Sequence, residues 1–223
     1  MYLEIHFCAS LISIVNVSKF ISQGYEIQGI TSNRVRHFLN NLCSYDDVVY
    51  LELGTLMGST LFAATMNNDI YNFAVDDYSD AECKPMTNNI HWNEVGNTHE
   101  MFQKYFEKYK TDKSTFLNSD ILDLKEEDFK GKKPNVVFYD ASHDYVQQLN
   151  CLNHIAPFLA DKFILVVDDA NFDGVIESAI QFVKDNKYDL YFERKILSKI
   201  IENPHHWWNG LYVMVLENPN EGN

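Results

Sequence analysis

Carboxylate side chains stand directly after two apolar runs in the second half of the chain. Asp140 follows residues 136–139, and Asp168 and Asp169 follow residues 163–167. If these runs are neighbouring parallel strands, their carboxyl ends meet at one edge of a sheet, and we expect the carboxylates to share one cleft. Such oxygen ligands suit Mg²⁺, which takes one or two carboxylates together with waters and substrate oxygens. Alternatively, the same side chains could contact a cofactor or cap the following helix without any metal.

A histidine lies close to the first of these carboxylates in sequence. His143 could accept a proton from a substrate hydroxyl, because the ordinary pKa of imidazole lies near neutrality. A metal held by Asp140, Asp168 and Asp169 would lower the pKa of the same hydroxyl. His143 could also do no more than order the start of a helix. Asp140 and His143 are therefore the candidate catalytic residues.

A glycine-containing turn follows an earlier apolar run, in the sequence ELGTLMGST at residues 52–60. Gly54 permits a tight turn, and Gly58 lets a ligand approach the backbone closely. Ser59 or Thr60 could cap the next helix, whose free N–H groups favour an anion such as a carboxylate. The GxxxG spacing differs from the GxGxxG of dinucleotide-binding enzymes, and the GxxxxGK[ST] phosphate loop is missing from the sequence. The glycines could also serve strand–helix packing alone.

Acidic residues also follow the next two strand-like runs. Asp76 comes roughly 20 residues after the first glycine, where an acidic side chain commonly holds the ribose hydroxyls of a nucleoside. Asp120 could pair with an adenine amino group. Asp76 could equally be a solvated residue at a strand end, and Asp120 a turn or cap residue.

The elements that position these residues alternate along the chain. Strand-like runs alternate with helical patterns, which indicates a parallel sheet covered on both faces. The last two runs have no helix between them, so we expect them to pair antiparallel. The predicted strands are 48–53, 70–75, 114–117, 136–139, 163–167, 188–196 and 211–216, and the predicted helices are 33–43 (with Ser32 as N-cap), a helix from 59, 98–109, 145–159 and 175–186.

Taken together, these motifs resemble those of class I methyltransferases. The turn at 52–60, VDD at 75–77, FYDASHDY at 138–145 and VVDD at 166–169 all carry the resemblance, which extends over about residues 31–216. More narrowly, the D-x-x-H-x-Y pattern is similar to that of macrocin-type sugar O-methyltransferases. Some of those relatives have a basic residue just after the VVDD pattern. Here that position is Asn171, whose amide cannot accept a proton, so their catalytic base does not carry over.

The resemblance implies an α/β, three-layer αβα Rossmann-like class I methyltransferase fold, with a seven-stranded, mostly parallel sheet and the last strand antiparallel. It implies transfer of a methyl group from S-adenosylmethionine to a hydroxyl of a small molecule, either a sugar or a ring-bearing acceptor, with Mg²⁺ as a second cofactor that could be required. The residues expected at the cofactor are Glu52, Gly54 and Gly58 at its methionine part, Asp76 at its ribose, Asp120 at its adenine, and also Ser59 and Asp140.

Composition limits the kinds of substrate and the cellular location that we expect for the protein. A net charge of −14 without an extended basic run argues against a nucleic-acid substrate. The apolar stretch at 11–17 is too short for a membrane span, and we expect it to be part of a helical segment at 1–45 that precedes a cofactor-binding domain at 46–218. We expect a cytoplasmic protein in which Cys8, Cys43, Cys83 and Cys151 are free thiols. The sequence leaves open whether the protein forms a homodimer.

Two further segments and two rival functions complete the expectations. Residues 77–92 are expected to form a loop or a short helix near the cleft, a segment that could act as a lid. His205, His206, Trp207 and Trp208 could form the wall of an acceptor pocket or the tip of a hairpin. The rival functions are an NAD-dependent oxidoreductase on a similar sheet, and a non-catalytic module that binds a nucleoside.

Overall fold

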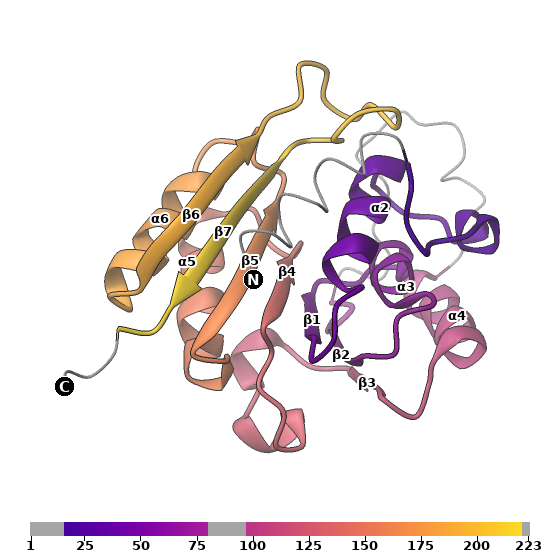
Figure 1. The fold of residues 1–223 in the computed structure, drawn as a ribbon, viewed down its shortest axis with the longest axis horizontal. Coiled ribbons are helices and arrows are strands. Elements are labelled where there is room, and N and C mark those ends of the chain that lie inside the picture. Colours follow the sequence, from indigo (N-terminus) through magenta and orange to yellow (C-terminus); the bar gives the residue numbers. More distant parts are fainter. Residues whose placement is uncertain (1–15, 80–96, 220–223) are drawn as a thin grey trace.

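A seven-stranded sheet runs through the middle of the molecule in the order β3-β2-β1-β4-β5-β7-β6 (Figure 1). The computed structural model describes residues 16–79 and 97–219. The strands are β1 Val49–Leu53, β2 Tyr71–Val75, β3 Ser114–Leu117, β4 Val136–Tyr139, β5 Lys162–Asp168, β6 Asp189–Ile196 and β7 Leu211–Glu217. The helices are α2 Asn33–Leu42, α3 Ser59–Thr65, α4 Thr98–Tyr109, α5 Tyr145–Ile155 and α6 Val175–Asp185.

The strand directions confirm the predicted topology. β1 pairs in parallel with both β2 and β4, β2 with β3, and β4 with β5. β7 lies between β5 and β6 and is antiparallel to both. The carboxyl ends of the five parallel strands therefore meet at one edge of the sheet, as the placement of the acidic residues requires.

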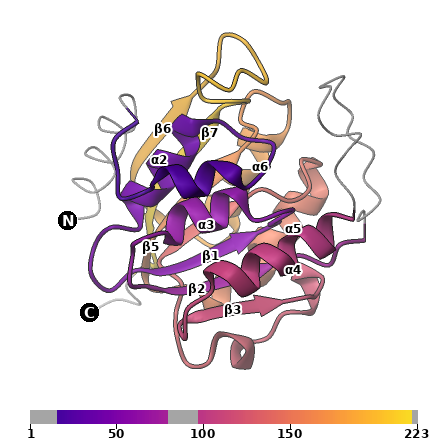
Figure 2. The ribbon, with the colours of Figure 1, turned by 90° about the vertical axis from the view of Figure 1, so that its right-hand side faces the viewer.

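Helices cover the sheet on both faces because successive side chains of a strand point to opposite sides. In β5, Ile164 and Val166 enter one core with side chains of α2, α3 and α4. Phe163, Leu165 and Val167 enter the other core with side chains of α5 and α6. Figure 2 shows α2, α3 and α4 together on one side of the sheet. The three-layer αβα architecture is thus confirmed.

The helix boundaries follow local chemistry. Ser32 caps α2 by accepting a hydrogen bond from the backbone N–H of Val35, as expected. The expected capping of α3 by Ser59 or Thr60 is wrong, because the helix begins at Ser59 and its N-cap is Gly58 in the left-handed conformation, without a side-chain cap. The helix expected over 145–159 changes to a 3₁₀ turn after Ile155, where Pro157 lacks the N–H that a continuing helix requires.

Part of the N-terminal segment is described. Within it, a 3₁₀ helix at Ser22–Glu26 precedes α2, and Ile27 and Phe38 join the same core as Tyr50 of β1. Most of the apolar stretch at 11–17 and of the loop expected at 77–92 lies outside the described residues, as do Cys8 and Cys83. Cys43 and Cys151 are free and buried, as expected. Within 16–79 and 97–219, every helix falls short of the length and apolarity that crossing a bilayer requires.

Candidate functional site

Three polar side chains converge where β4 and β5 end. Asp140 follows β4, Asp169 follows β5, and His143 lies in the loop that leads to α5. Nε2 of His143 is 2.7 Å from Oδ2 of Asp169 and 3.8 Å from Oδ1 of Asp140. One donor atom from each of these residues lies within 4.8 Å of the others. The structure thus brings together both candidate catalytic residues and one further candidate metal ligand.

Burial and mutual attraction set the charges of this cluster. Burial raises the pKa of Asp140 to about 6, an effect that His143 opposes and the charge of Asp169 reinforces. Burial lowers the pKa of His143, but the two carboxylates outweigh it and raise that pKa to about 10. At neutral pH, His143 is therefore an imidazolium ion held between two carboxylates.

Asp168 lies behind the cluster. Its side chain is almost fully buried, and its Oδ1 accepts a hydrogen bond of 2.9 Å from the backbone N–H of Asp169. Burial, together with the charges of Asp140 and Asp169, raises the pKa of Asp168 well above its ordinary value. The carboxylate thus fixes the backbone of Asp169, which has a left-handed φ of +58°. Its predicted role as a metal ligand stays a prediction.

The donor set of the cluster suits a divalent cation. Nε2 of His143 and Oδ1 of Asp169 are buried and lack a hydrogen-bond partner among the described residues, and Nε2 forms an ion-pair contact of 2.7 Å with Oδ2 of Asp169. Carboxylate oxygens are suitable ligands for Mg²⁺ and Mn²⁺. A neutral imidazole nitrogen is also a suitable ligand for iron and zinc.

The glycine turn lies directly against the end of β4. Gly54 has a φ of +85°, and a Cβ atom at this position would lie 2.1 Å from the carbonyl oxygen of Asp140. Only glycine fits such a contact in a left-handed conformation. Gly58 also has a left-handed φ of +83°, and a Cβ there would meet the ring of Phe62. The segments after β1 and β4 therefore share one edge of the site.

Asp76, at the end of β2, binds the same turn. Its Oδ2 accepts hydrogen bonds from the backbone N–H groups of Thr55 at 2.8 Å and Leu56 at 2.9 Å. Its Oδ1 accepts one from the N–H of Tyr78 at 2.9 Å. Since a carboxylate has about four acceptor positions, capacity for a ligand hydroxyl remains. The predicted ribose contact stays a prediction, and the observed role of Asp76 is to hold the turn.

Glu52 lies beneath the turn and is fully buried. Its carboxylate accepts hydrogen bonds from the hydroxyls of Tyr50 at 2.5 Å and Thr60 at 2.9 Å. Burial raises its pKa to about 8, although these hydrogen bonds oppose the shift. Ser59 is also buried, and its hydroxyl packs against the backbone of Gly29. Both residues support the turn from within, and their predicted contacts with a cofactor are not tested.

Asp120 follows β3 and caps a 3₁₀ turn at Ile121–Asp123. Its Oδ1 accepts a hydrogen bond of 2.8 Å from the backbone N–H of Leu122. The structure thus shows the capping role that the sequence left open beside the adenine contact, which stays a prediction.

Two supporting residues were not predicted. The ring of Tyr78 stacks on that of His99 with a centroid distance of 4.3 Å, and its hydroxyl donates to the carbonyl of Leu56. Asn171 donates to the carbonyl and accepts from the N–H of Ser198, which ties the segment after β5 to the segment after β6. The position of Tyr78 directly after two aspartates was the available signal for the first residue. The supporting role of Asn171 could not be predicted from a local pattern, because its partner Ser198 lies 27 residues away.

Exposed apolar side chains surround the cluster. The ring of Phe172 lies 6.1 Å from that of His143, and Tyr145 lies beside Gly174. Leu197 lies next in sequence to Ser198, which is bonded to Asn171, two residues after Asp169. Phe172, Tyr145 and Leu197 are 41%, 38% and 54% exposed, so apolar surface faces solvent beside the cluster.

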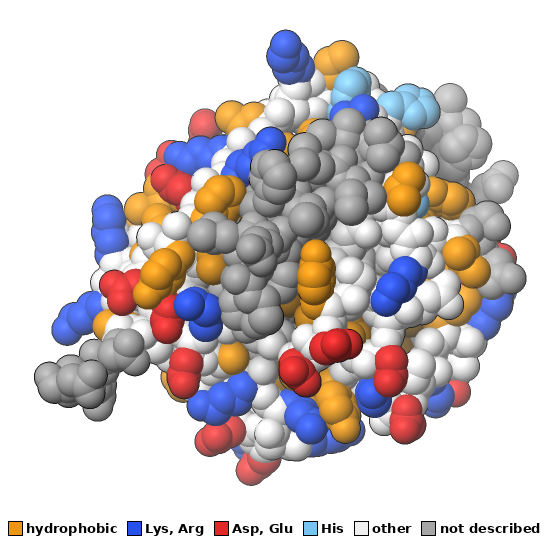
Figure 3. Space-filling model, in the orientation of Figure 1, with side chains coloured by type: hydrophobic (Ala, Val, Ile, Leu, Met, Phe, Trp, Pro, Cys, Tyr) orange, Lys and Arg blue, Asp and Glu red, His pale blue; other side chains and the backbone are white. Residues whose placement is uncertain are grey.

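The histidine–tryptophan segment between β6 and β7 forms a folded turn. Asn203 and Trp208 make an isolated antiparallel bridge, and Trp208 is buried. Trp207 packs edge-on against Phe38 of α2. Histidine side chains reach the surface above this connection, at the upper margin of Figure 3. The position of both tryptophans is therefore explained by their packing within a folded turn, the second of the two alternatives for this segment.

Comparisons with known proteins give a consistent picture. A family model described as a methyltransferase domain matches residues 51–170. No curated protein sequence matches the chain significantly. A structure described as "a putative caffeoyl-CoA O-methyltransferase from Staphylococcus aureus" is similar with a TM-score of 0.58 and 13% identity, covering 96% of this chain and 99% of that one.

Two other similar structures have different descriptions. The N-methyltransferase NodS from Bradyrhizobium japonicum, in complex with S-adenosyl-L-homocysteine, has a TM-score of 0.53 and 12% identity, covering 84% of this chain and 88% of that one. A structure described as "a putative RNA methyltransferase" from Pyrococcus horikoshii has a TM-score of 0.55 and 10% identity, covering 91% and 100%. At these identities the likeness establishes the Rossmann-like fold.

Proposed function

The chain belongs to the methyltransferase-domain family, and from this membership we propose that it transfers the methyl group of S-adenosylmethionine to a hydroxyl of a small, ring-bearing molecule. The observation that carries the proposal is the meeting of the Gly54 turn, Asp76 and the Asp140–His143–Asp169 cluster at one edge of the sheet. The proposed nucleoside site at the turn and Asp76 therefore lies next to the cluster that is proposed to remove the proton.

The electrostatics of this edge favour the cofactor. When bound, the cofactor supplies a methyl group on a positively charged sulfonium, which is already a good leaving group. Asp76, Asp140 and Asp169 come from three different segments around the turn. Their negative charge attracts a sulfonium and leaves the protein mainly the tasks of alignment and proton removal.

Proton removal falls to the cluster. As the bond between the acceptor oxygen and the methyl carbon forms and the carbon–sulfur bond breaks, the hydroxyl proton passes to Asp140. Asp140 is the more accessible of the two carboxylates, with its side chain 25% exposed against 11% for Asp169. His143 holds both carboxylates in place as an imidazolium ion. A divalent cation bound by Asp140 and Asp169 would take the place of the imidazolium charge, with His143 neutral, and would polarise the hydroxyl and lower its pKa.

The acceptor is proposed from the surface around the cluster. Phe172, Tyr145 and Leu197 offer apolar faces, which suit a ring or aliphatic portion better than a fully hydrated sugar. A net charge of −14 disfavours a polyanionic nucleic acid. We therefore favour a ring-bearing alcohol or phenol over a sugar or an RNA.

The test is calorimetric titration with S-adenosylhomocysteine, followed by S-adenosylmethionine turnover with a panel of phenols, sugars and RNA oligonucleotides. Micromolar binding and turnover with phenols are expected, and Asp140→Asn should retain binding while losing turnover. Stabilisation by NAD instead of S-adenosylhomocysteine, or no binding at millimolar ligand, would contradict the proposal.

A further inference from the structure

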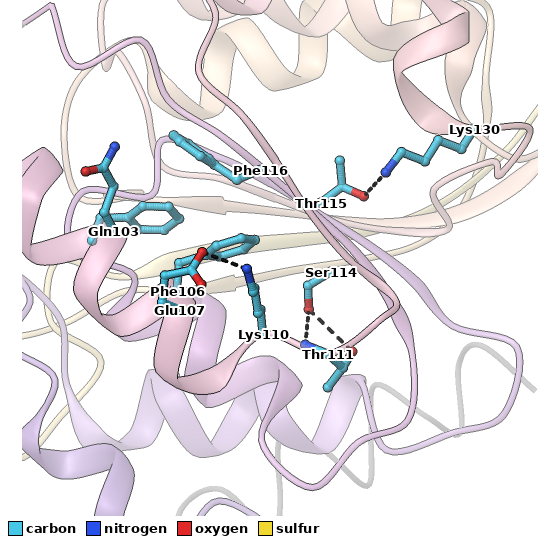
Figure 4. Close-up of a pocket in the computed structure, with 10 residues that line it drawn as sticks. Gln103, Phe106, Glu107, Lys110, Thr111, Ser114, Thr115, Phe116 and Lys130 are labelled. Atoms are coloured by element: carbon cyan, nitrogen blue, oxygen red, sulfur yellow. Dashed lines mark hydrogen bonds and ion pairs between the residues drawn. The ribbon is translucent and has the colours of Figure 1, made fainter.

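A groove of about 670 Å³ lies between helix α4 and strand β3, away from the candidate active site. Figure 4 shows Phe106 of α4 and Phe116 of β3 at its apolar floor, with Ser114 and Thr115 along the strand. Lys110 and Lys130 line it as well. The groove is formed where β3 begins and α4 ends, whereas the active-site residues follow the carboxyl ends of the strands.

One side of β3 has free backbone groups. β3 is the outermost strand and, within the described part of the chain, pairs only with β2. The N–H groups of Asn72 and Asp76 donate to the carbonyls of Lys113 and Leu117. Because backbone groups alternate in direction along a strand, the N–H and C=O of Phe116 point away from β2, towards the open side.

The groove runs along this open side. Phe116 packs against Phe102 of α4 at a centroid distance of 4.7 Å, so its side chain lies on the α4 face of the sheet. The next side chain towards the N-terminus, Thr115, lies on the opposite face and accepts a hydrogen bond of 3.0 Å from Lys130. A groove lined by side chains of both faces must pass along the edge of the strand, where the unpaired backbone groups are.

Charge distinguishes this edge from the rest of the molecule. Residues 104–133 hold eight of the 18 lysines and arginines but only seven of the 32 acidic residues, so the segment carries +1 in a chain of −14. Lys110 is paired with Glu107, and Lys132 lies over the ring of Tyr71.

β3 itself has no lysine, but Lys130 reaches the side chain of Thr115 from a neighbouring segment, and positive charge at a strand edge hinders its pairing with another copy. Two copies joined through β3 would bring both Lys130 side chains and their basic neighbours together, which is unfavourable. A strand with acidic side chains would instead be attracted. The helix-and-edge-strand arrangement is also the one in which extended peptides bind by adding a strand to a sheet.

We propose that the β3–α4 groove binds an extended segment of a partner protein, in which aliphatic and acidic residues alternate. The aliphatic side chains pack on Phe106 and Phe116, the acidic ones face Lys130 on the opposite side, and the partner backbone bonds to Phe116. Adjacent residues of a strand point to opposite faces, so the alternation follows from the lining of the groove.

The experiment uses the full chain and a fluorescein-labelled hexapeptide of alternating valine and glutamate, measured by fluorescence anisotropy. We expect saturable binding, at least tenfold weaker binding by Lys130→Glu, and no change in Lys187→Glu, a substitution of an exposed lysine before β6. The same peptide with N-methyl groups on alternate amides should not bind, because it keeps the side chains but cannot pair with the edge. S-adenosylhomocysteine binding should be equal in all variants, which separates this site from the proposed function.

Three results would overturn the inference. They are absence of binding at millimolar peptide, equal binding of the N-methylated peptide, and equal binding by Lys130→Glu. Sedimentation showing a dimer that Lys130→Glu dissociates would assign the edge to a second copy instead.

Discussion

The carboxylate of Asp76 holds Leu56 in a left-handed backbone conformation. Oδ2 of Asp76 lies 2.9 Å from the backbone nitrogen of Leu56, whose φ is +47°. A residue with a Cβ in this region costs of order 1–3 kcal/mol, which hydrogen bonds to a carboxylate offset. The shape of the predicted cofactor turn therefore depends on an acidic residue of the next strand.

Asp76→Asn should loosen this turn. Because the amide can offer only one oxygen to the three N–H groups of Thr55, Leu56 and Tyr78, we expect a loss of about 1–3 kcal/mol in the free energy of unfolding. S-adenosylhomocysteine should bind at least tenfold more weakly in calorimetry. Asp77→Asn is the matched control, since that carboxylate is exposed and, among the described residues, bonds to Ser79 alone. Equal effects of the two substitutions would contradict the role of Asp76.

Gly54→Ala should be far more damaging than Gly131→Ala. Both glycines have a left-handed φ, of +85° and +72°, so alanine is strained at either position. A Cβ at position 54 would collide with the Asp140 carbonyl at 2.1 Å, whereas one at position 131 meets nothing within 4 Å. Urea denaturation should show a loss of about 1 kcal/mol at position 131 and a larger loss at 54. Similar losses would mean that contact with β4 is unimportant.

Asn171→Asp should destabilise the protein more than Asn171→Ala. The asparagine amide donates to the Ser198 carbonyl and accepts from its N–H. Alanine removes both bonds, at about 0.5–1.5 kcal/mol each, while aspartate places a carboxylate oxygen against a carbonyl. Thermal melting of the wild type, Asn171→Ala and Asn171→Asp at pH 7 measures the order of their stabilities. If aspartate were the milder change, the amide orientation described here would be wrong.

Glu52→Gln should flatten the dependence of stability on pH. The folded-state pKa of Glu52, about 8, lies above its ordinary value of 4.5. Between these values the folded state binds more protons than the unfolded state, so stability falls as pH rises from about 5 to 8. The glutamine variant cannot ionise and should lose this component. Urea titrations at pH 5, 6.5 and 8 measure it, and parallel curves for the two proteins would show that Glu52 ionises normally.

Replacing Asp169 should weaken divalent-cation binding. We expect Mn²⁺, followed by its electron paramagnetic resonance signal, to bind the wild-type protein and to bind Asp169→Asn at least tenfold more weakly. Asp112→Asn changes an exposed carboxylate far along the chain from the cluster and should bind as the wild type does. Equal Mn²⁺ binding by Asp169→Asn would remove the metal from the proposal and leave proton transfer to the side chains alone.

Much of the fold could be predicted because its signals are local. The runs at 114–117 and 136–139 match β3 and β4 residue for residue, and the pattern at 98–109 matches α4. These segments combine apolar periodicity with clear end signals. Capping of α3 was mispredicted because the helix already begins at Ser59, after Gly58 in a left-handed conformation where a Cβ would meet the ring of Phe62, and periodicity does not report this.

The sequence predicted which residues follow the strand ends at the candidate site, but it did not predict the hydrogen bonds that these residues make. Asp140, His143 and Asp169 meet because β4 and β5 are neighbours, which topology alone implies. The hydrogen bonds of Asp76 to the turn, and of Asn171 to Ser198, depend on how distant loops lie against each other. Long-range polar geometry of that kind leaves no periodic trace in a sequence.

The insertion of β7 between β5 and β6 has a consequence for synthesis. As the chain leaves the ribosome, residues 189–196 emerge before 211–217, yet β6 has no neighbour in the sheet other than β7. β6 and its exposed Leu190 and Tyr191 therefore lack a strand partner until the residues of β7 have been synthesised. Until then, the unpaired strand is a site that chaperones can bind and through which nascent chains can aggregate.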